Sequence, residues 1–153
     1  MISVLFVCLG NICRSPALEE TLRAKLIEKG LGDKVVVDSC GVEPYHPGGA
    51  ANPKMIEAAK KWGISINTHS KRFKEEYFDT FTHLFAVDKK ILERLNSLPK
   101  SNKKVEFATK YSSRFRGLEI PDPFIGSDED YPLVMEMIVD AAEGIALHLE
   151  KNL

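Results

Sequence analysis

Residues 2 to 39 read ISVLFVCLGNICRSPALEETLRAKLIEKGLGDKVVVDS, and this stretch decides the fold. It opens with a nearly continuous apolar run, Ile2 to Val7, as a strand buried on both faces requires. Leucines then recur at every fourth position from Leu18 to Leu26, which is helical spacing. A second apolar run, Lys34 to Ser39, follows. The order of strand, helix and strand predicts a βαβ unit and therefore a parallel sheet.

Local signals set the expected ends of the first helix. Ser15 followed by Pro16 predicts an N-cap and a proline at the first helical position, where its missing N–H costs nothing. Lys29 in the last turn and Gly30 after it are typical of a helix end. We therefore expect a helix that Ser15 caps, that begins at Pro16 and that ends at Gly30.

The middle of the chain repeats the alternation. Asn52 and Pro53 predict the start of a second helix that ends near Gly63, with Trp62 packing it against the core. Residues 82 to 87 predict a third strand, and Asp88 is placed to cap the helix that follows.

The last third of the chain predicts a short fourth strand at residues 105 to 108, then an irregular stretch through Phe124. Ser127 is expected to cap a long final helix. Its apolar stripe should pack against the core and comprises Val134, Met137, Ile138, Ala141, Ile145 and Leu149. Neither an internal repeat nor a composition break divides residues 1 to 153, so we expect one domain. Its predicted fold class is α/β, a three-layer open twisted sheet of about four parallel strands with helices on both faces.

Composition narrows the classes of function. There are 21 basic and 22 acidic residues and a net charge of −1, with no block of like charge, so nucleic acid is not an expected partner. No run approaches the roughly 20 apolar residues of a membrane helix, and the opening residues lack the basic start of a signal peptide. The three cysteines fit neither a disulfide framework nor metal spacing. We expect a cytoplasmic monomer without metal or cofactor.

The loop after the first strand has the residue types that an anion site requires. In parallel sheets ligands bind beyond the carboxyl ends of the strands, which is where this loop lies. Gly10 and Asn11 readily accept positive φ, so the backbone N–H groups can turn inward, while Arg14 can hold two oxygens of a phosphate in its planar fork. The predicted phosphate-binding loop comprises Leu9, Gly10, Asn11, Ile12, Cys13, Arg14 and Ser15.

Cys8 lies at the base of this loop, where the inward N–H groups and the guanidinium should hold its sulfur as a thiolate at neutral pH. The Ser15 hydroxyl could donate a hydrogen bond to that sulfur. Taken alone, a cysteine that ends a buried strand is usually a small apolar residue, and only the surrounding loop favours a nucleophile. A P-loop NTPase is not supported, because the pattern GxxxxGK[ST] is absent.

Val7 to Glu20, VCLGNICRSPALEE, closely resembles the signature V-C-x-G-N-x-C-R-S-P of the low-molecular-weight protein tyrosine phosphatases. The resemblance extends over the whole chain in length and element order. It implies the phosphotyrosine protein phosphatase I-like fold, and a mechanism in which Cys8 takes the phosphoryl group and water then releases it. The implied substrates are phosphotyrosine in proteins or small aryl phosphates.

The resemblance also nominates residues outside the loop. The family's general acid lies in an Asp-Pro-aromatic motif, which Asp122, Pro123 and Phe124 match here. Asp122 would protonate the leaving group and later activate water, although in isolation it would be an ordinary turn aspartate. Phe124 and Tyr45 would form two walls of a slot for the substrate ring, although both could equally be surface or packing aromatics.

A second group of residues would support the loop. His69 matches a family histidine that holds the loop asparagine, here Asn11, and would otherwise be a solvated histidine. In the family the thiol equivalent to Cys13 can trap an oxidised nucleophile as a disulfide; otherwise Cys13 is a packing thiol. Cys40 has no assigned role.

Four competing functions are considered. An arsenate reductase on this scaffold needs two further cysteines, and none follows Cys40. A related arginine phosphatase tends to have threonine where this chain has Ile12. A non-catalytic phosphate-binding module would need neither the thiol nor the acid, and a flavin carrier has no use for a thiolate in its phosphate loop.

Overall fold

The first strand forms the centre of the sheet. The structure is a computed structural model that describes residues 1–153. It contains the strands β1 (Ile2–Cys8), β2 (Val35–Gly41), β3 (His83–Ala86) and β4 (Val105–Phe107). All neighbours are parallel and the order is β2-β1-β3-β4, so β1 pairs with both β2 and β3. The four predicted strands and their parallel pairing are confirmed.

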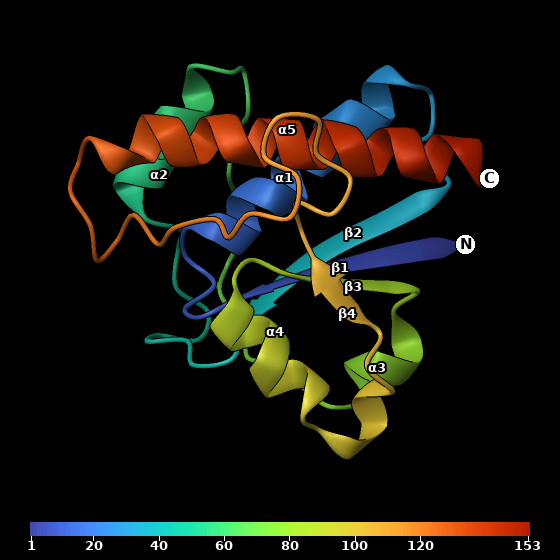
Figure 1. The fold of residues 1–153 in the computed structure, drawn as a ribbon. Helices are drawn as coiled ribbons and strands as arrows, with labels where there is room; N and C mark the ends of the chain where they lie inside the picture. Colours follow the sequence, from blue (N-terminus) through green and yellow to red (C-terminus); the bar gives the residue numbers. More distant parts are fainter.

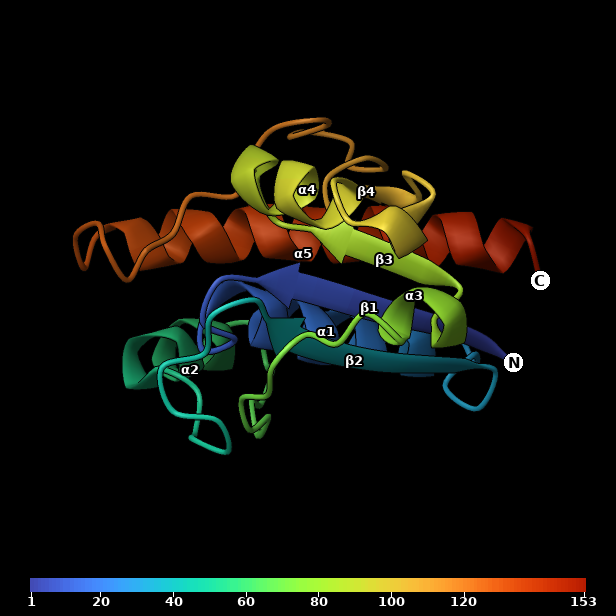
Figure 2. The same cartoon turned by 90° about the horizontal axis from the view of Figure 1, so that it is seen from below.

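Helices cover both faces of this sheet (Figures 1 and 2). On one side lie α1 (Arg14–Glu28), α2 (Pro53–Lys60) and α5 (Asp130–Lys151), with α5 packed along α1 and against α2. On the other side lie α4 (Lys89–Asn96) and the short α3 (Tyr77–Thr80), and a 3₁₀ turn at Pro99–Ser101 follows α4. The predicted three-layer α/β fold is therefore confirmed; α3 was not predicted.

The apolar stripe of α5 was predicted correctly, because each of its six residues is buried, as are the leucines of α1. Trp62 was assigned wrongly: half of its side chain is exposed. The helix ends at Lys60 and the chain turns at Gly63, which has φ of 75°, so Trp62 is not carried round to the core face. Met55 and Ala59 anchor α2 instead.

The two helix starts predicted from asparagine and aspartate are confirmed. The Asn52 side chain accepts hydrogen bonds from the N–H groups of Lys54 (2.8 Å) and Met55 (3.3 Å), and Asp88 accepts from Ile91 (2.9 Å). Such caps satisfy N–H groups that have no partner within the helix.

The two starts predicted from serine are wrong. Helix α1 already begins at Arg14, and the Ser15 hydroxyl turns back to bond Cys8 and Asn11 in the preceding loop. Helix α5 begins at Asp130, whose carboxylate accepts a hydrogen bond from the N–H of Ser127 at 2.9 Å. In both cases a contact with the adjoining loop replaces the cap.

The strand β1 lies between β2 and β3. The chain therefore runs from β1 to its neighbour on one side, β2, and later crosses to its neighbour on the other side, β3. The loop after Cys8 therefore opens at the point where the strand order reverses, which is the usual ligand position in open parallel sheets.

Candidate active site

The loop between β1 and α1 depends on an unusual backbone conformation at one residue. Asn11 has φ of 56°, a left-handed value that asparagine tolerates better than most residues. In this conformation its N–H points at the Cys8 sulfur, 3.2 Å away. Gly10, expected to share the positive φ, does not have it. Its missing side chain leaves room for Tyr45 instead, because a Cβ there would lie 3.0 Å from Cε2 of that half-exposed ring.

The Cys8 sulfur has two polar neighbours. Besides the N–H of Asn11, the Ser15 hydroxyl lies 2.8 Å from it. The side-chain amide of Asn11 donates to the same Ser15 oxygen at 2.8 Å, so the hydroxyl proton of Ser15 is left for other acceptors. Those acceptors are the sulfur and, at 3.3 Å, the carbonyl of Cys40. The arrangement can therefore direct two hydrogen-bond donors at the sulfur, as a nucleophilic sulfur requires.

A chain of hydrogen bonds extends from Asn11 away from the pocket. The other amide proton of Asn11 goes to the Ser39 hydroxyl at 3.0 Å, and Ser39 donates in turn to the Glu19 carboxylate at 2.6 Å. Glu19 is buried, and that burial raises its pKa, although Arg23 lies 2.6 Å from it. With both amide protons used, the orientation of the Asn11 side chain is fixed.

The prediction for His69 is wrong. The remaining polar atom of Asn11, its carbonyl oxygen, accepts a hydrogen bond from the main-chain N–H of Lys71 at 3.0 Å. His69 is exposed, and its backbone bridges to Ala50 rather than to the loop. The support that we expected from an imidazole is supplied by a peptide group two residues further along the chain.

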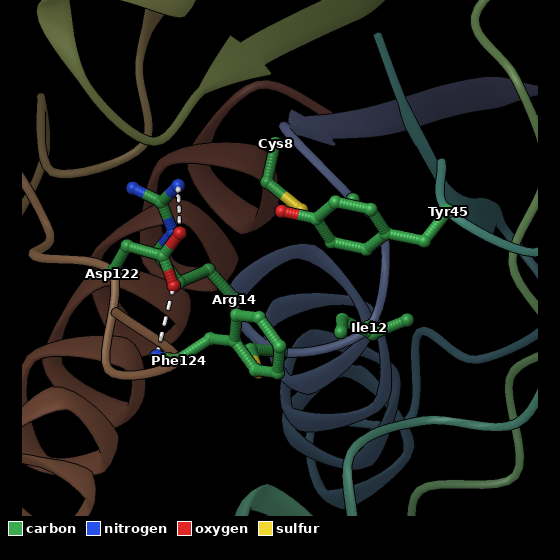
Figure 3. Close-up of a pocket in the computed structure, with 8 residues that line it drawn as sticks. Cys8, Ile12, Arg14, Tyr45, Asp122 and Phe124 are labelled. Carbon is green, nitrogen blue, oxygen red and sulfur yellow. Dashed lines mark hydrogen bonds and ion pairs between the residues drawn. The ribbon is translucent and has the colours of Figure 1, made fainter. Parts of the chain in front are cut away.

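Arg14 is buried, and its guanidinium lies beside the carboxylate of Asp122 (Figure 3). Its Nη1 donates to the carboxylate of Asp88 and to the carbonyl of Ile120, both at 2.8 Å. Its Nη2 lies 3.7 Å from the carboxylate of Asp122. The other oxygen of Asp122 accepts from the N–H of Phe124 at 3.0 Å, which closes the turn predicted for Asp-Pro. Nη2 thus forms an ion pair with Asp122 at a distance longer than a hydrogen bond.

These side chains meet around a small cavity of about 10 Å³ (Figure 3). It is lined by Cys8, Gly10, Ile12, Cys13, Arg14, Tyr45, Asp122 and Phe124. Residues that the sequence nominated, such as Cys8 and Asp122, therefore line the same cavity although they lie more than a hundred positions apart in the chain. Tyr45 and Phe124 touch each other across the mouth, with ring centroids 5.9 Å apart, and each is about half exposed.

The three thiols differ in their surroundings, and none forms a disulfide. Burial raises the pKa of Cys13 to about 12, and the nearby Cys8 and Asp122 act in the same direction. Burial also raises the pKa of Cys40 well above its ordinary value. Both thiols therefore keep their protons at neutral pH, whereas Cys8 lies between the N–H of Asn11 and the hydroxyl of Ser15.

Some residues of the site were missed or only partly recognised from the sequence. Gly41 ends β2 beside the loop, where a Cβ would lie 2.6 Å from the carbonyl oxygen of Leu9. Ser39 and Glu19 form the hydrogen-bond chain, and Asp88, expected only to cap α4, also binds Arg14. Ser39, Gly41 and Asp88 lie at or next to the carboxyl ends of strands flanking β1, which is the signal that could have found them.

No helix has the length and hydropathy needed to cross a membrane.

Comparison with known proteins agrees with the geometry of the site. The family model described as low molecular weight phosphotyrosine protein phosphatase matches residues 3–153. A low molecular weight phosphotyrosine protein phosphatase of Sus scrofa is 32% identical over 141 residues, covering 90% of this chain and 89% of its own length.

Among solved structures, a protein tyrosine phosphatase of Entamoeba histolytica superposes with a TM-score of 0.92 at 29% identity, covering 99% of both chains. The arginine phosphatase YwlE superposes with a TM-score of 0.87 at 27% identity, over 99% of this chain and 97% of its own. Together with the cysteine and the arginine of one loop between β1 and α1, these matches place the chain in the low molecular weight phosphotyrosine protein phosphatase family of hydrolases.

Proposed function

We propose that the protein hydrolyses phosphotyrosine and other aryl phosphomonoesters through a cysteinyl-phosphate intermediate. The observation that carries this proposal is the position of the Cys8 sulfur, between the N–H of Asn11 and the hydroxyl of Ser15, in a cavity shared with Arg14 and Asp122. The sulfur is stabilised as an anion beside a guanidinium that can bind a phosphate, and a carboxyl group lies at the same opening.

In the first step, the phosphate dianion binds to the inward N–H groups of the loop and to Nη2 of Arg14. The thiolate of Cys8 attacks phosphorus, so that a sulfur–phosphorus bond forms as the bond to the phenolic oxygen breaks. Asp122, protonated at this stage, gives its proton to that oxygen. The substrate leaves as a neutral phenol rather than as a phenolate, which is the contribution expected of a general acid.

In the second step, Asp122 is ionised and takes a proton from a water molecule that attacks the phosphorus. The sulfur–phosphorus bond breaks, inorganic phosphate is released and Cys8 becomes a thiolate again. The Ser15 hydroxyl, 2.8 Å from the sulfur, donates to the departing anion. A hydrogen bond that strengthens as charge develops lowers the barrier of this step.

The aryl preference follows from the walls of the cavity, which are Ile12, Tyr45 and Phe124. In the described conformation the cavity of about 10 Å³ has room for about one water molecule. A substrate ring between two aromatic walls needs about 3.5 Å on each side, or roughly 7 Å between the walls, whereas their centroids are 5.9 Å apart. We therefore propose that Tyr45 and Phe124 separate when the substrate enters, which their exposure allows.

The test measures hydrolysis of p-nitrophenyl phosphate across pH by the parent protein, Cys8→Ser and Asp122→Ala. We expect no turnover by Cys8→Ser and a loss of about 10²- to 10⁴-fold for Asp122→Ala. Cys40→Ser is the matched control, because this thiol is buried and takes no part in the proposed steps. Turnover by Cys8→Ser near the parent rate would refute the proposal. Phosphoarginine, assayed in parallel, should be hydrolysed far more slowly than phosphotyrosine.

A further inference from the structure

A second cavity adjoins the one that contains Cys8. Its volume is about 530 Å³, which is within the range of ligand-binding clefts. Ile12, Tyr45 and Phe124 line both cavities, so the two adjoin at these residues. The remaining walls come from the segment between β2 and α2, namely His46, Gly49, Ala50, Ala51, Asn52 and Pro53. We call this second cavity the flanking groove.

The flanking groove is apolar and has no carboxylate or ammonium group in its walls. The segment from Gly49 to Ala51 contributes only small side chains, which leaves the groove hollow, while Pro53 and Ile12 provide apolar surface. His46 is the one lining residue that could gain a positive charge. An apolar side chain would be removed from water here without desolvating a charge.

The other side of the mouth is different. A cavity of about 330 Å³ there is lined by Lys90, Glu119, Asp88 and Asp122 together with apolar residues such as Ile125. The active-site mouth therefore has one apolar flank and one charged flank, so a polypeptide that crosses it would meet two distinct environments.

A phosphotyrosine residue within a polypeptide cannot be enclosed by the small cavity alone. Its phosphate would lie at the loop, its ring would lie between Tyr45 and Phe124, and its backbone would emerge at the mouth. The residues next to it in sequence would then lie over the flanks, within reach of the flanking groove.

We infer that the flanking groove binds a large apolar side chain, such as Leu, Ile, Met or Phe, of a polypeptide substrate within two positions of its phosphotyrosine. This inference rests on the proposed function and narrows it. The substrate class is a phosphotyrosine polypeptide with an apolar neighbour, in preference to a small aryl phosphate. Filling an apolar pocket of this kind changes kcat/KM by about ten- to hundredfold.

The test uses a glycine-rich phosphotyrosine peptide in which a single leucine is moved through the two positions on either side of the phosphotyrosine. We expect kcat/KM to rise about tenfold or more at one of these positions, and to stay near the glycine value when aspartate replaces that leucine. A flat profile, with no position favouring leucine over glycine, would overturn the inference.

The variant Ala50→Glu tests whether the flanking groove is responsible. Ala50 is exposed and its side chain lines the groove, so glutamate there places bulk and charge in it without disturbing the core. We expect the leucine preference to be lost, while hydrolysis of p-nitrophenyl phosphate stays near the parent rate. Lys90→Glu, on the charged flank, is the matched control and should keep the preference. A preference that survives in Ala50→Glu would contradict the assignment.

A binding measurement separates this inference from the proposed function. Cys8→Ser keeps the walls of both cavities but lacks the nucleophile. Its affinity for fluorescent versions of the same peptides should show the same leucine preference. The double variant that also carries Ala50→Glu should lose this preference. If the peptides bind in this way and the parent protein hydrolyses none of them, the groove assignment stands and the proposed hydrolysis fails.

Discussion

At the scale of single residues, Asn11 determines the shape of the site. Its left-handed backbone turns its N–H toward Cys8, and each polar atom of its side chain has a partner. The partners are Ser15, Ser39 and the backbone of Lys71, which belong to three different segments of the chain. One side chain of the loop therefore contacts the start of α1, β2 and the segment before α3.

Asn11→Ala should remove these bonds and also make the left-handed backbone unfavourable by about 1–2 kcal/mol. We expect kcat/KM for p-nitrophenyl phosphate to fall at least tenfold, because the donors to the sulfur lose their positions. Asn102→Ala is the control: Asn102 also has a positive φ, 49°, but is exposed in the turn after the 3₁₀ helix. It should lose stability and keep its activity. If kcat/KM of Asn11→Ala stayed within twofold of the parent value, this account would be contradicted.

The three cysteines should react very differently with iodoacetamide at pH 7, although all three are buried. Cys13 and Cys40 keep their protons because burial raises their pKa values, so we expect carboxamidomethylation at Cys8 alone. Peptide mapping by mass spectrometry measures this, and phosphate or vanadate should protect Cys8. Cys13→Ser should label at the parent rate. Modification of Cys13 as fast as Cys8 would show that the donors around Cys8 do not control reactivity.

The sequence identified the residues whose chemistry is specific and missed those whose contribution is geometric. Cys8 and Arg14 are predictable because a thiol and a guanidinium at that spacing after a strand are chemically informative, whereas Asp122 is nominated only by the resemblance to the family. The partner of Asn11 was assigned to His69 but is the N–H of Lys71, which almost any residue could supply. Gly41 was overlooked because its role is to leave space, and space cannot be read from one sequence. The roles proposed for Tyr45 and Phe124 remain predictions.

At the scale of secondary-structure elements, apolar periodicity was sufficient for the strands and the long helices. The errors lie at boundaries, where loop contacts override local signals: Ser15 bonds the loop rather than capping α1, and Asp130 rather than Ser127 begins α5. The four-residue helix α3 has too few residues to show a period.

The packing of the phosphate loop against the end of β2 leads to a prediction for Gly41. In Gly41→Ala the new methyl group would lie 2.6 Å from the Leu9 carbonyl oxygen and 2.9 Å from the Asn11 nitrogen. Both are backbone atoms, so the loop must move, and we expect activity to fall by more than tenfold. Gly32→Ala is the control, because its methyl group would meet only Ile27, whose exposed side chain is the nearest group and can move. Activity and Tm of both variants are compared; an active Gly41→Ala would contradict the prediction.

Asp140 of α5 holds the loop before it and should make stability depend on pH. Although burial opposes this, hydrogen bonds from the Ser113 hydroxyl and the N–H groups of Arg114 and Phe115 lower its pKa. A lowered pKa means that the ionised carboxylate stabilises the fold. This stabilisation is fully present above the unfolded-state pKa of about 3.9, and it is lost as pH falls through the lower pKa of the folded state.

We therefore expect Asp140→Ala to lose about 1–2 kcal/mol of unfolding free energy at pH 7, with the deficit shrinking below about pH 4. Urea unfolding of parent and variant at pH 7, 5 and 3.5 measures the difference. Glu136→Ala is the control, since its exposed ion pair with Arg114 should contribute little. A deficit that stays constant down to pH 3.5 would show that the carboxylate charge is not responsible.

At the scale of the whole molecule, the carboxyl edge of the sheet gathers the site. Cys8 ends β1, Ser39 and Gly41 lie in β2, Asp88 follows β3 after one residue, and Asp122 lies on the loop that leads from β4 to α5. Strand order predicted that these ends meet; the side-chain contacts between them depend on packing that periodicity does not encode. That the chain forms one domain stays a prediction.

Asp88 connects three of these segments, because it caps α4 and binds Arg14, which in turn binds the carbonyl of Ile120. Two substitutions separate its roles. Asp88→Asn keeps a good cap, since asparagine caps as well as aspartate, while Asp88→Ala should lose about 1 kcal/mol of stability in addition. Both remove the charge that holds Arg14, so both should lower kcat/KM for p-nitrophenyl phosphate to a similar extent.

The same pair should differ in Tm but agree in their response to ligand. Phosphate at 100 times its Kd stabilises a protein by about 2.7 kcal/mol. We therefore expect phosphate to raise the Tm of the parent protein. Arg14→Ala should show none, and the two Asp88 variants a reduced rise, because a loosely held guanidinium binds phosphate more weakly. The opposite result is that Asp88→Asn keeps the parent's activity and its full rise in Tm with phosphate. That result would show that Arg14 needs no fixed orientation, and that the link between α4 and the phosphate loop is structural only.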